Sequence, residues 1–502
     1  MSEAPENPPV APSENAGRRF EGRWMIKNAM VIDGTGGPVF GPAHILIDDG
    51  KITRILEPGN MVGDNIDLPL LGIADHNVLD VAGSFVLPGL IDSHAHIGFA
   101  EQVESTEYVF KLWMGHGIAT VRELGAIGNG LDFVLGEKER SRNHDIVAPK
   151  IEPFVTFGQG ATEALTSDRL VREWVQSAAE RGAAGIKFFG AAPGAFEAAL
   201  DEASKVGLRS ACHHAQQHTA RVNALTTARW GLGSIEHSYG QAEVMYRDRM
   251  LPDVPASYVY TNEHDRFAQA GRLWEQTGGR GSAAWDDFLD ELVALGTTLV
   301  PTFAVYIPTR DAMAARTREW NSEYLGSRLE KFFEPDPHRH GSFFYNWGTE
   351  EEVAWNNNYR IWMSFVRDFS LRGGRVCAGS DSGFIYNLYG FGLVQELELF
   401  REAGMAPLEV IRSATLRAAE LIGKDDEIGS VEVGKVADLL IVDENPLANL
   451  KVLYGTGHYK LVDEGRMGHV GGVKYTIKDG VLYDAEKARA DVRELVSASR
   501  VS

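Results

Sequence analysis

An apolar run ending in a His-x-His pair stands at Val86-Leu87-Pro88-Gly89-Leu90-Ile91-Asp92-Ser93-His94-Ala95-His96. Because side chains alternate along a β-strand, residues two apart face the same side, so His94 and His96 can reach one metal ion. A pair of hydrogen-bonded surface histidines is the structural alternative. The pair's position at the carboxyl end of a buried strand favours the metal-ligand interpretation, since active sites of parallel barrels lie at that face.

Short β-like runs alternate with helical stretches on the C-terminal side of this segment. They are Phe85–Ile91, Ile118–Arg122, Ile151–Val155, Gly185–Phe189, Arg209–His214, Ser234–His237, Thr297–Phe303 and Arg375–Ser380. Eight strands separated by helices predict an α/β fold, a (β/α)₈ TIM-like barrel over residues 84–424. A doubly wound open sheet is the alternative that spacing alone leaves open.

The segments that flank the barrel have a different pattern. Residues 23–83 and 425–484 contain short β-like runs broken by turns such as Asp48-Asp49-Gly50, and predict a small composite β-sandwich domain built from both ends of the chain. Residues 1–22 are rich in Pro, Glu, Ser and Asn and predict a disordered tail without a signal peptide. Residues 485–502 are expected to form a C-terminal helix or tail.

Two connections inside the barrel, residues 238–296 and 304–374, are long enough to be lids or local subdomains. The second is dense in aromatic residues. Most of these are expected to build an additional packed layer of helices, and a few to line a substrate pocket.

Lys187 lies inside an apolar strand, where a lysine is costly unless it is paired or modified. A lysine whose end reaches solvent is one interpretation, and a lysine carboxylated by carbon dioxide, which can bridge two cations, is the other. The next strand ends in His213-His214. Either histidine could be a ligand, and the alternation of side chains places the two on opposite faces.

Two further strand ends carry candidate ligands. Ser234-Ile235-Glu236-His237 supplies another histidine, His237, and the last strand ends in Asp381. Asp381 could merely cap the following helix. In a metal site it would bind a cation and take a proton from water. Imidazole and carboxylate groups suit Zn²⁺, with Mn²⁺ or Co²⁺ as alternatives, and two such cations would share a hydroxide that attacks the substrate.

Together these motifs resemble the amidohydrolase superfamily over nearly the whole chain, from about Trp24 to Tyr483. The matching pieces are Val86–His96, Gly117–Gly125, Gly185–Lys187, His214-Ala215, Ser234–His237, Gly379-Ser380-Asp381 and Ile428–Asp438. The subgroup that the chain most resembles is the prolidase and imidazolonepropionase-like branch, which has a carboxylated lysine in a Gly-x-x-x-Ile-Lys element. Gly182–Lys187 matches that element, although the branch often has Asp where Ala184 stands.

The resemblance implies two divalent metal ions. His94 and His96 would hold one ion, His214 and His237 the other, and a carboxylated Lys187 would bridge them. Asp381 would bind the first ion and act as general acid and base. His214 is selected over His213 because a histidine followed by Ala ends the fifth strand in this branch. Glu123 stands where the family usually has Asp, and the two long connections depart from the family's compact pattern.

The expected activity is hydrolysis of an amide or peptide-type C–N bond in a small molecule, such as a dipeptide or an N-acyl amino acid. A urea, carbamate or lactone hydrolase is an alternative with the same residues. A mononuclear deaminase of the superfamily would not need a carboxylated lysine. A binding protein on an inactive barrel is disfavoured, because all six ligand positions are filled.

Composition limits the partners. The 502 residues carry a net charge of −21 and no basic cluster, which argues against nucleic acid and anionic membranes as partners. Only two cysteines occur, which fits a reducing compartment and a cytoplasmic location. A homo-oligomer is expected from the resemblance.

Overall fold

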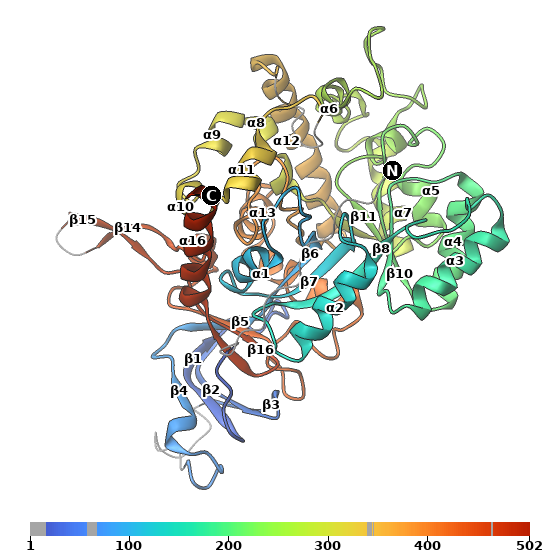
Figure 1. Cartoon of the computed structure of the whole chain (residues 1–502). Coiled ribbons are helices and arrows are strands. Elements are labelled where there is room, and N and C mark those ends of the chain that lie inside the picture. The colour runs from blue at the N-terminus through green and yellow to red at the C-terminus, as the bar shows by residue number, and fades with distance from the viewer. Residues whose placement is uncertain (1–16, 58–67, 339–343, 345, 463–464, 502) are drawn as a thin grey trace.

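The computed structural model describes residues 17–57, 68–338, 344, 346–462 and 465–501. Its centre is a parallel sheet whose strands follow one another in sequence order (Figure 1). These strands are β6 (Leu90–Ala95), β7 (Ile118–Gly125), β8 (Lys150–Thr156), β9 (Gly185–Phe188), β10 (Arg209–His213), β11 (Ser234–Glu236) and β12 (Thr298–Val300).

Residues 375–381 occupy the eighth position and close the sheet on itself. Val376 forms a parallel bridge with Leu299 of β12. On the other side, the Ser93 N–H in β6 donates a hydrogen bond to the Ala378 carbonyl at 2.9 Å. The segment therefore lies between the last and the first strands, which confirms the predicted TIM-like barrel and excludes the open sheet.

Asp92 strengthens this closure from inside the barrel. Its Oδ1 accepts hydrogen bonds from the Ser380 N–H at 2.9 Å and from the His94 N–H at 3.1 Å, and its Oδ2 accepts from the Ser380 hydroxyl at 2.5 Å. Burial raises the pKa of Asp92 to about 6, against the opposing effect of these hydrogen bonds. The ends of the first and eighth strands are thus fixed to each other.

Helices follow the strands and cover the barrel. They are α1 (Thr106–Met114), α2 (Leu131–Arg142), α3 (Asp168–Glu180), α4 (Pro193–Lys205), α5 (Ala224–Arg229), α6 (Glu263–Ala270), α7 (Ala283–Leu295), α8 (Ile307–Arg310), α9 (Ala312–Arg316), α10 (Asn321–Tyr324), α11 (Ser327–Phe333), α12 (Thr349–Leu371), α13 (Phe391–Glu402), α14 (Pro407–Ser413) and α15 (Leu416–Ile422). Over the described residues, no helix is both long enough and apolar enough to cross a membrane.

The aromatic residues of the second long connection form a packed layer, as predicted. On α12, Trp355, Tyr359 and Trp362 recur at helical spacing and are all buried. The Trp355 ring stacks on Tyr306 at 5.5 Å between centroids, and the Trp362 ring lies 4.3 Å from that of Phe303. Two aromatics of this connection, Phe343 and Tyr345, lie outside the described residues.

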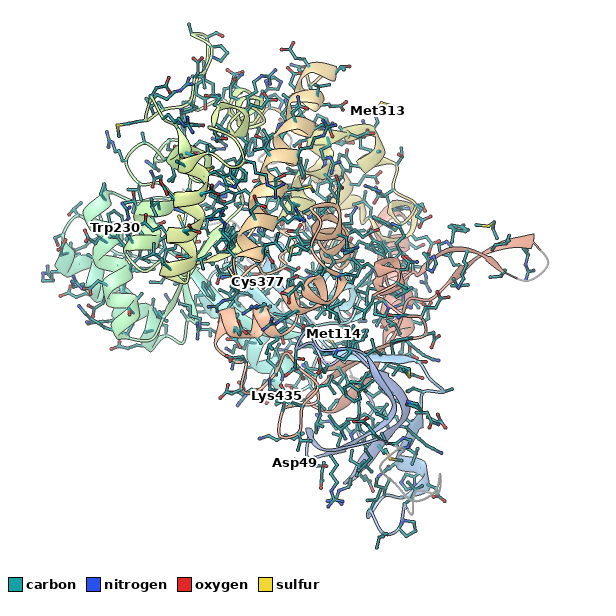
Figure 2. The ribbon with its side chains drawn as sticks, turned by 180° about the vertical axis from the view of Figure 1, so that it is seen from behind. Asp49, Met114, Trp230, Met313, Cys377 and Lys435 are labelled. Atoms are coloured by element: carbon teal, nitrogen blue, oxygen red, sulfur yellow. The ribbon has the colours of Figure 1, made fainter. Side chains whose placement is uncertain are left out.

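The accessory β-domain is an eight-stranded sheet that joins both ends of the chain, and Figure 2 labels Asp49 and Lys435 in this part of the molecule. Its strands are β1 (Trp24–Val31), β2 (Phe40–Asp48), β3 (Lys51–Leu56), β4 (Val78–Asp80), β5 (Phe85–Pro88), β13 (Leu439–Val442), β16 (Val473–Lys478) and β17 (Val481–Asp484). A separate hairpin of β14 (His458–Val462) and β15 (Arg466–Val470) projects from the body, and α16 (Ala485–Val501) ends the chain.

The predicted disordered tail, residues 1–22, falls mostly outside the described residues. Residues 17–22 are described, and Arg18 exchanges two backbone hydrogen bonds with Leu482 of β17, at 2.7 and 3.0 Å. The chain therefore joins the accessory sheet before residue 23.

The prediction of one strand over Phe85–Ile91 is wrong. The structure divides this run at Gly89 into β5, which belongs to the accessory sheet, and β6, which begins the barrel. The backbones are close here, because a Cβ atom added at Gly89 would lie 2.6 Å from the Ala119 Cβ. An apolar run carries no sign of this change of partner, whereas the glycine marks the close approach.

We predict that Gly89→Ala destabilises the protein by about 1–3 kcal/mol, because the added methyl group overpacks the junction. Gly136→Ala in α2 is the control. Its added Cβ would meet no described atom within 4 Å, so stability should hold or rise by roughly 0.5–1 kcal/mol. Urea denaturation monitored by circular dichroism measures both changes. Equal midpoints for Gly89→Ala and the wild type would contradict the packing described.

Candidate metal centre

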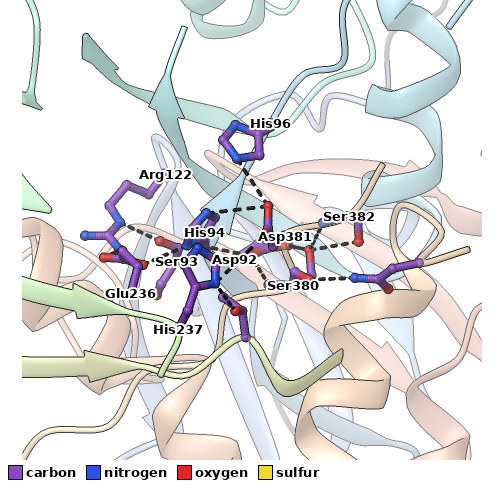
Figure 3. A network of polar contacts seen from close by, with 12 residues as sticks. Asp92, Ser93, His94, His96, Arg122, Glu236, His237, Ser380, Asp381 and Ser382 are labelled. Atoms are coloured by element: carbon purple, nitrogen blue, oxygen red, sulfur yellow. Dashed lines mark hydrogen bonds and ion pairs between the residues drawn. The ribbon is translucent and has the colours of Figure 1, made fainter. Parts of the chain in front are cut away.

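His94, His96 and Asp381 meet at the carboxyl end of the barrel (Figure 3). Their ligand atoms all lie within 4.8 Å of one another. The Asp381 Oδ1 is 3.5 Å from the His94 Nε2 and 3.2 Å from the His96 Nε2. Asp381 takes a left-handed backbone conformation, with φ at 50°, while its N–H donates to the His94 carbonyl at 2.8 Å. The first and eighth strands thus present two imidazoles and one carboxylate to a single point.

His96 lies between two carboxylates. Besides Asp381, the Glu123 Oε1 is 3.8 Å from the His96 Nδ1. Burial lowers the pKa of His96, but Asp381 and Glu123 outweigh it and raise the pKa to about 9. Glu123, which stands where the family usually has Asp, is therefore within the reach of the site. The two carboxylates around His96 therefore stabilise a positive charge at this position.

His237 follows β11 and joins the same group. It has a φ of 62°, which turns the chain at the strand end. The His237 Nδ1 lies 2.6 Å from the Thr302 hydroxyl and 3.9 Å from the Asp381 Oδ2. Its ring centroid is 4.9 Å from that of His94. Burial lowers the pKa of His237 well below its usual value, helped by the neighbouring His213 and His94, so the imidazole is held in the neutral form that binds metals.

Lys187 is a buried amine without a hydrogen-bond partner among the described residues. Its side chain is 1% exposed. Burial lowers the pKa of Lys187, Glu236 and Asp381 oppose this effect, and Arg122 adds to it. The Lys187 Nζ lies 5.4 Å from the centroid of the Phe189 ring, but no described group accepts a hydrogen bond from it, and a buried ammonium without an acceptor is costly.

The fifth strand contributes His213 rather than His214. In the parallel pairing of β10 with β11, His213 is in register with Glu236, which lies inside the barrel. Residues in register share a face of the sheet, and the His213 ring lies 4.5 Å from that of His237. His214 points to the helical layer, where its Nε2 is 2.8 Å from the Thr227 hydroxyl of α5. The structure therefore brings His213 to the centre and leaves His214 outside it, contrary to the choice based on the resemblance.

The sequence reasoning missed Glu236 as a residue of this site. Its Oε2 lies 2.7 Å from the His94 Nδ1, and its Oε1 accepts hydrogen bonds from the Arg122 Nη2 at 2.8 Å and the Ser234 hydroxyl at 2.5 Å. Burial raises the pKa of Glu236, but Arg122 and His94 outweigh it and hold the pKa far below its usual range. The ionised carboxylate orients His94 with its Nε2 toward Asp381, as partners of metal-binding histidines do. The available sequence signal for Glu236 was that Arg122 and Glu236, two residues of opposite charge, stand in strands that are otherwise largely apolar.

The chain is similar to several known proteins in sequence and in fold. Residues 365–482 match the Amidohydrolase family. An imidazolonepropionase from Symbiobacterium thermophilum is 25% identical over 419 residues, which cover 78% of this chain and 83% of that enzyme. In sequence, the chain is therefore similar to members of the amidohydrolase superfamily.

Other known proteins match the chain in part or in fold. A 5'-deoxyadenosine deaminase from Methanobrevibacter smithii is 29% identical over 120 residues, so this chain spans only 27% of that enzyme's length and the match covers 22% of this chain. A solved Xaa-Pro dipeptidase with methionine bound in its active site has a TM-score of 0.59 at 19% identity, covering 92% of this chain and 100% of that one. At this identity the likeness concerns the fold.

We predict that His213→Ala lowers the metal content of the purified protein, because it removes a nitrogen from the centre. His214→Ala is the matched control. It should leave metal content unchanged and cost about 1–3 kcal/mol of stability through the lost hydrogen bond to Thr227. Elemental analysis by plasma mass spectrometry reads the first effect and urea denaturation the second. If His214→Ala lost metal while His213→Ala kept its full metal content, His214 rather than His213 would be the residue of the centre.

Proposed function

We propose that this protein is an amidohydrolase that binds two divalent cations and hydrolyses an amide or peptide-type C–N bond of a small molecule. His94, His96 and Asp381 would hold one cation, and His213 and His237 the other. A carboxylated Lys187 would bridge them. The observation that carries the proposal is the buried Lys187 amine, which has no described hydrogen-bond partner in a site rich in imidazole.

The residues present fit such a pair of cations. Imidazole nitrogens and carboxylate oxygens suit Zn²⁺, Mn²⁺ or Co²⁺. An ammonium at Lys187 would repel cations, whereas a carbamate would attract them. The lowered pKa favours the neutral amine, whose nitrogen can form a bond to carbon dioxide with release of one proton. The product carries one negative charge and two oxygens, enough to contact both cations.

The chain's own residues prepare the reaction. When bound, the cations supply an acidified water and polarise a substrate carbonyl. The Glu236 carboxylate fixes the His94 ring through Nδ1, and the Thr302 hydroxyl does the same for His237. The Asp381 carboxylate, within 4 Å of three imidazoles, accepts the proton from the attacking water and passes it to the leaving nitrogen.

The proposed substrates are dipeptides or N-acyl amino acids. The fold shared with a Xaa-Pro dipeptidase supports this class. A second candidate is a mononuclear deaminase, because His94, His96 and Asp381 alone could hold one cation and the chain shares a segment with a 5'-deoxyadenosine deaminase. Counting metals separates the two candidates.

We predict that the wild type binds two equivalents of zinc per chain and turns over members of a panel of dipeptides and N-acetyl amino acids. Lys187→Ala should lose at least one equivalent and at least about a hundredfold in kcat, since changes outside the ligand shell alone cost about 10–100-fold. Added acetate should restore part of the activity by replacing the missing carboxylate.

A second buried lysine provides the control. Lys478 donates hydrogen bonds to the Ser141 carbonyl and hydroxyl and to the Ala148 carbonyl. Lys478→Met should therefore reduce stability without changing metal content. One zinc per chain in the wild type, with Lys187→Ala still active, would contradict the binuclear proposal and favour the deaminase.

A further inference from the structure

Three aromatic rings from separate segments form a row of contacts that begins beside His96. The Phe384 ring stands edge-on to the His96 ring, with 6.0 Å between centroids and 89° between planes. Phe332 of α11 lies 6.1 Å from Phe384, and Phe99, which follows β6, lies 5.8 Å from Phe332. Phe332 is buried, while Phe384 and Phe99 are each partly exposed. We call Phe99, Phe332 and Phe384 the aromatic wall.

A strained loop holds Phe384 in this position. The loop follows Asp381 and contains Ile385 at φ 49° and Tyr386 at φ 56°. A β-branched residue rarely adopts a left-handed conformation, and such strain persists only where the surroundings enforce it. Here the Gly383 carbonyl accepts from the Gln102 Nε2 at 2.8 Å, and the Gly383 N–H donates to the Asn387 carbonyl at 2.9 Å. Phe384 is therefore fixed by the same loop that presents Asp381.

Phe99, at the other end of the aromatic wall, is also held by close packing. Phe99 packs on the loop after β7, because a Cβ atom added at Gly128 would lie 2.5 Å from the Phe99 Cβ. Aromatic side chains with few rotatable bonds provide apolar contact at little entropic cost. The aromatic wall is thus a preformed apolar surface beside a polar centre.

The position of Asp381 determines which part of a substrate meets this surface. In the proposed reaction, Asp381 delivers a proton to the leaving nitrogen. The Asp381 Oδ1 is 3.2 Å from the His96 Nε2, and Phe384 adjoins the same imidazole. His96 is the imidazole nearest to Asp381 in this group, so in the proposed reaction the leaving nitrogen would lie toward the aromatic wall and the acyl side away from it.

We infer that Phe384 is a specificity-determining residue and that the aromatic wall receives a large apolar or aromatic side chain on the leaving amino acid. The substrates are then N-acyl derivatives or dipeptides whose C-terminal residue has such a side chain. This inference rests on the proposed function, because the proton transfer from Asp381 sets the orientation.

Phe189 provides a matched control on the other side of the centre. It follows β9, is 38% exposed, and its ring lies 5.7 Å from that of His213. The Lys187 Nζ lies 5.4 Å from the centroid of this ring, so Phe189→Ala can change the rates themselves, and the comparison uses the ratio of kcat/KM values. The variant removes aromatic surface near the centre without touching the aromatic wall. A general loss of aromatic surface can therefore be told from a specific effect of Phe384.

The test compares two substrate pairs on the zinc-loaded full-length protein. N-acetyl-L-phenylalanine and N-acetyl-L-alanine differ on the leaving side, and N-benzoylglycine and N-acetylglycine differ on the acyl side. The wild type should favour phenylalanine over alanine by at least about tenfold in kcat/KM, since apolar groups in fitted pockets discriminate by 10–200-fold. Phe384→Ala should bring this ratio close to one, mainly through KM for the phenylalanine substrate. The ratio for the acyl pair should not change.

Two further variants keep the result interpretable. Phe384→Leu retains apolar bulk and should keep a ratio between those of the wild type and Phe384→Ala, while Phe189→Ala should keep the wild-type ratio. A phenylalanine-to-alanine ratio near one in the wild type, or unchanged in both Phe384 variants, would overturn the inference and leave the proposed function standing. Absence of turnover for all four compounds would overturn the proposed function and the inference with it.

Discussion

The first and eighth strands of the barrel are joined through one buried carboxylate, that of Asp92. It accepts hydrogen bonds from the backbone and hydroxyl of Ser380 and from the backbone of His94. These two segments are 288 positions apart in sequence, so their proximity depends on completion of the barrel. Together with the hydrogen bonds from the Asp381 N–H to the His94 carbonyl and from the Ser93 N–H to the Ala378 carbonyl, these contacts hold Asp381 toward His94 and His96. The candidate centre therefore forms only when the eighth strand closes the barrel against the first.

Charges inside the barrel serve two different ends. Arg122 and Glu236 form an ion pair at 2.8 Å, with both side chains at most 1% exposed. Such a pair contributes little net stability, because desolvation offsets its attraction, but it fixes the ring of His94. Lys187 lacks a comparable partner among the described residues. In our proposal, a carbamate and two cations complete the charge balance that the side chains leave open, so the paired and unpaired charges have distinct roles.

Periodicity in the sequence was enough to predict the barrel and to select His94, His96 and Asp381, because alternation and strand ends are local features. It could not decide between His213 and His214. Alternation puts them on opposite faces, but only the register with the neighbouring strand shows which face is inside. The sequence also did not predict that the first apolar run divides between two sheets, because the strand with which each segment pairs is decided only in the assembled fold. Glu236 was overlooked because a carboxylate beside a histidine in sequence gives no indication that it contacts a different histidine in space.

A crystal structure of the zinc-loaded protein, with diffraction recorded at the zinc absorption edge, tests the centre most directly. Our account predicts two anomalous peaks within bonding distance of the inward-facing histidines, and electron density that continues beyond the Lys187 nitrogen into a planar three-atom group between the peaks. A single peak beside a bare lysine, or a peak bound to His214, would contradict it.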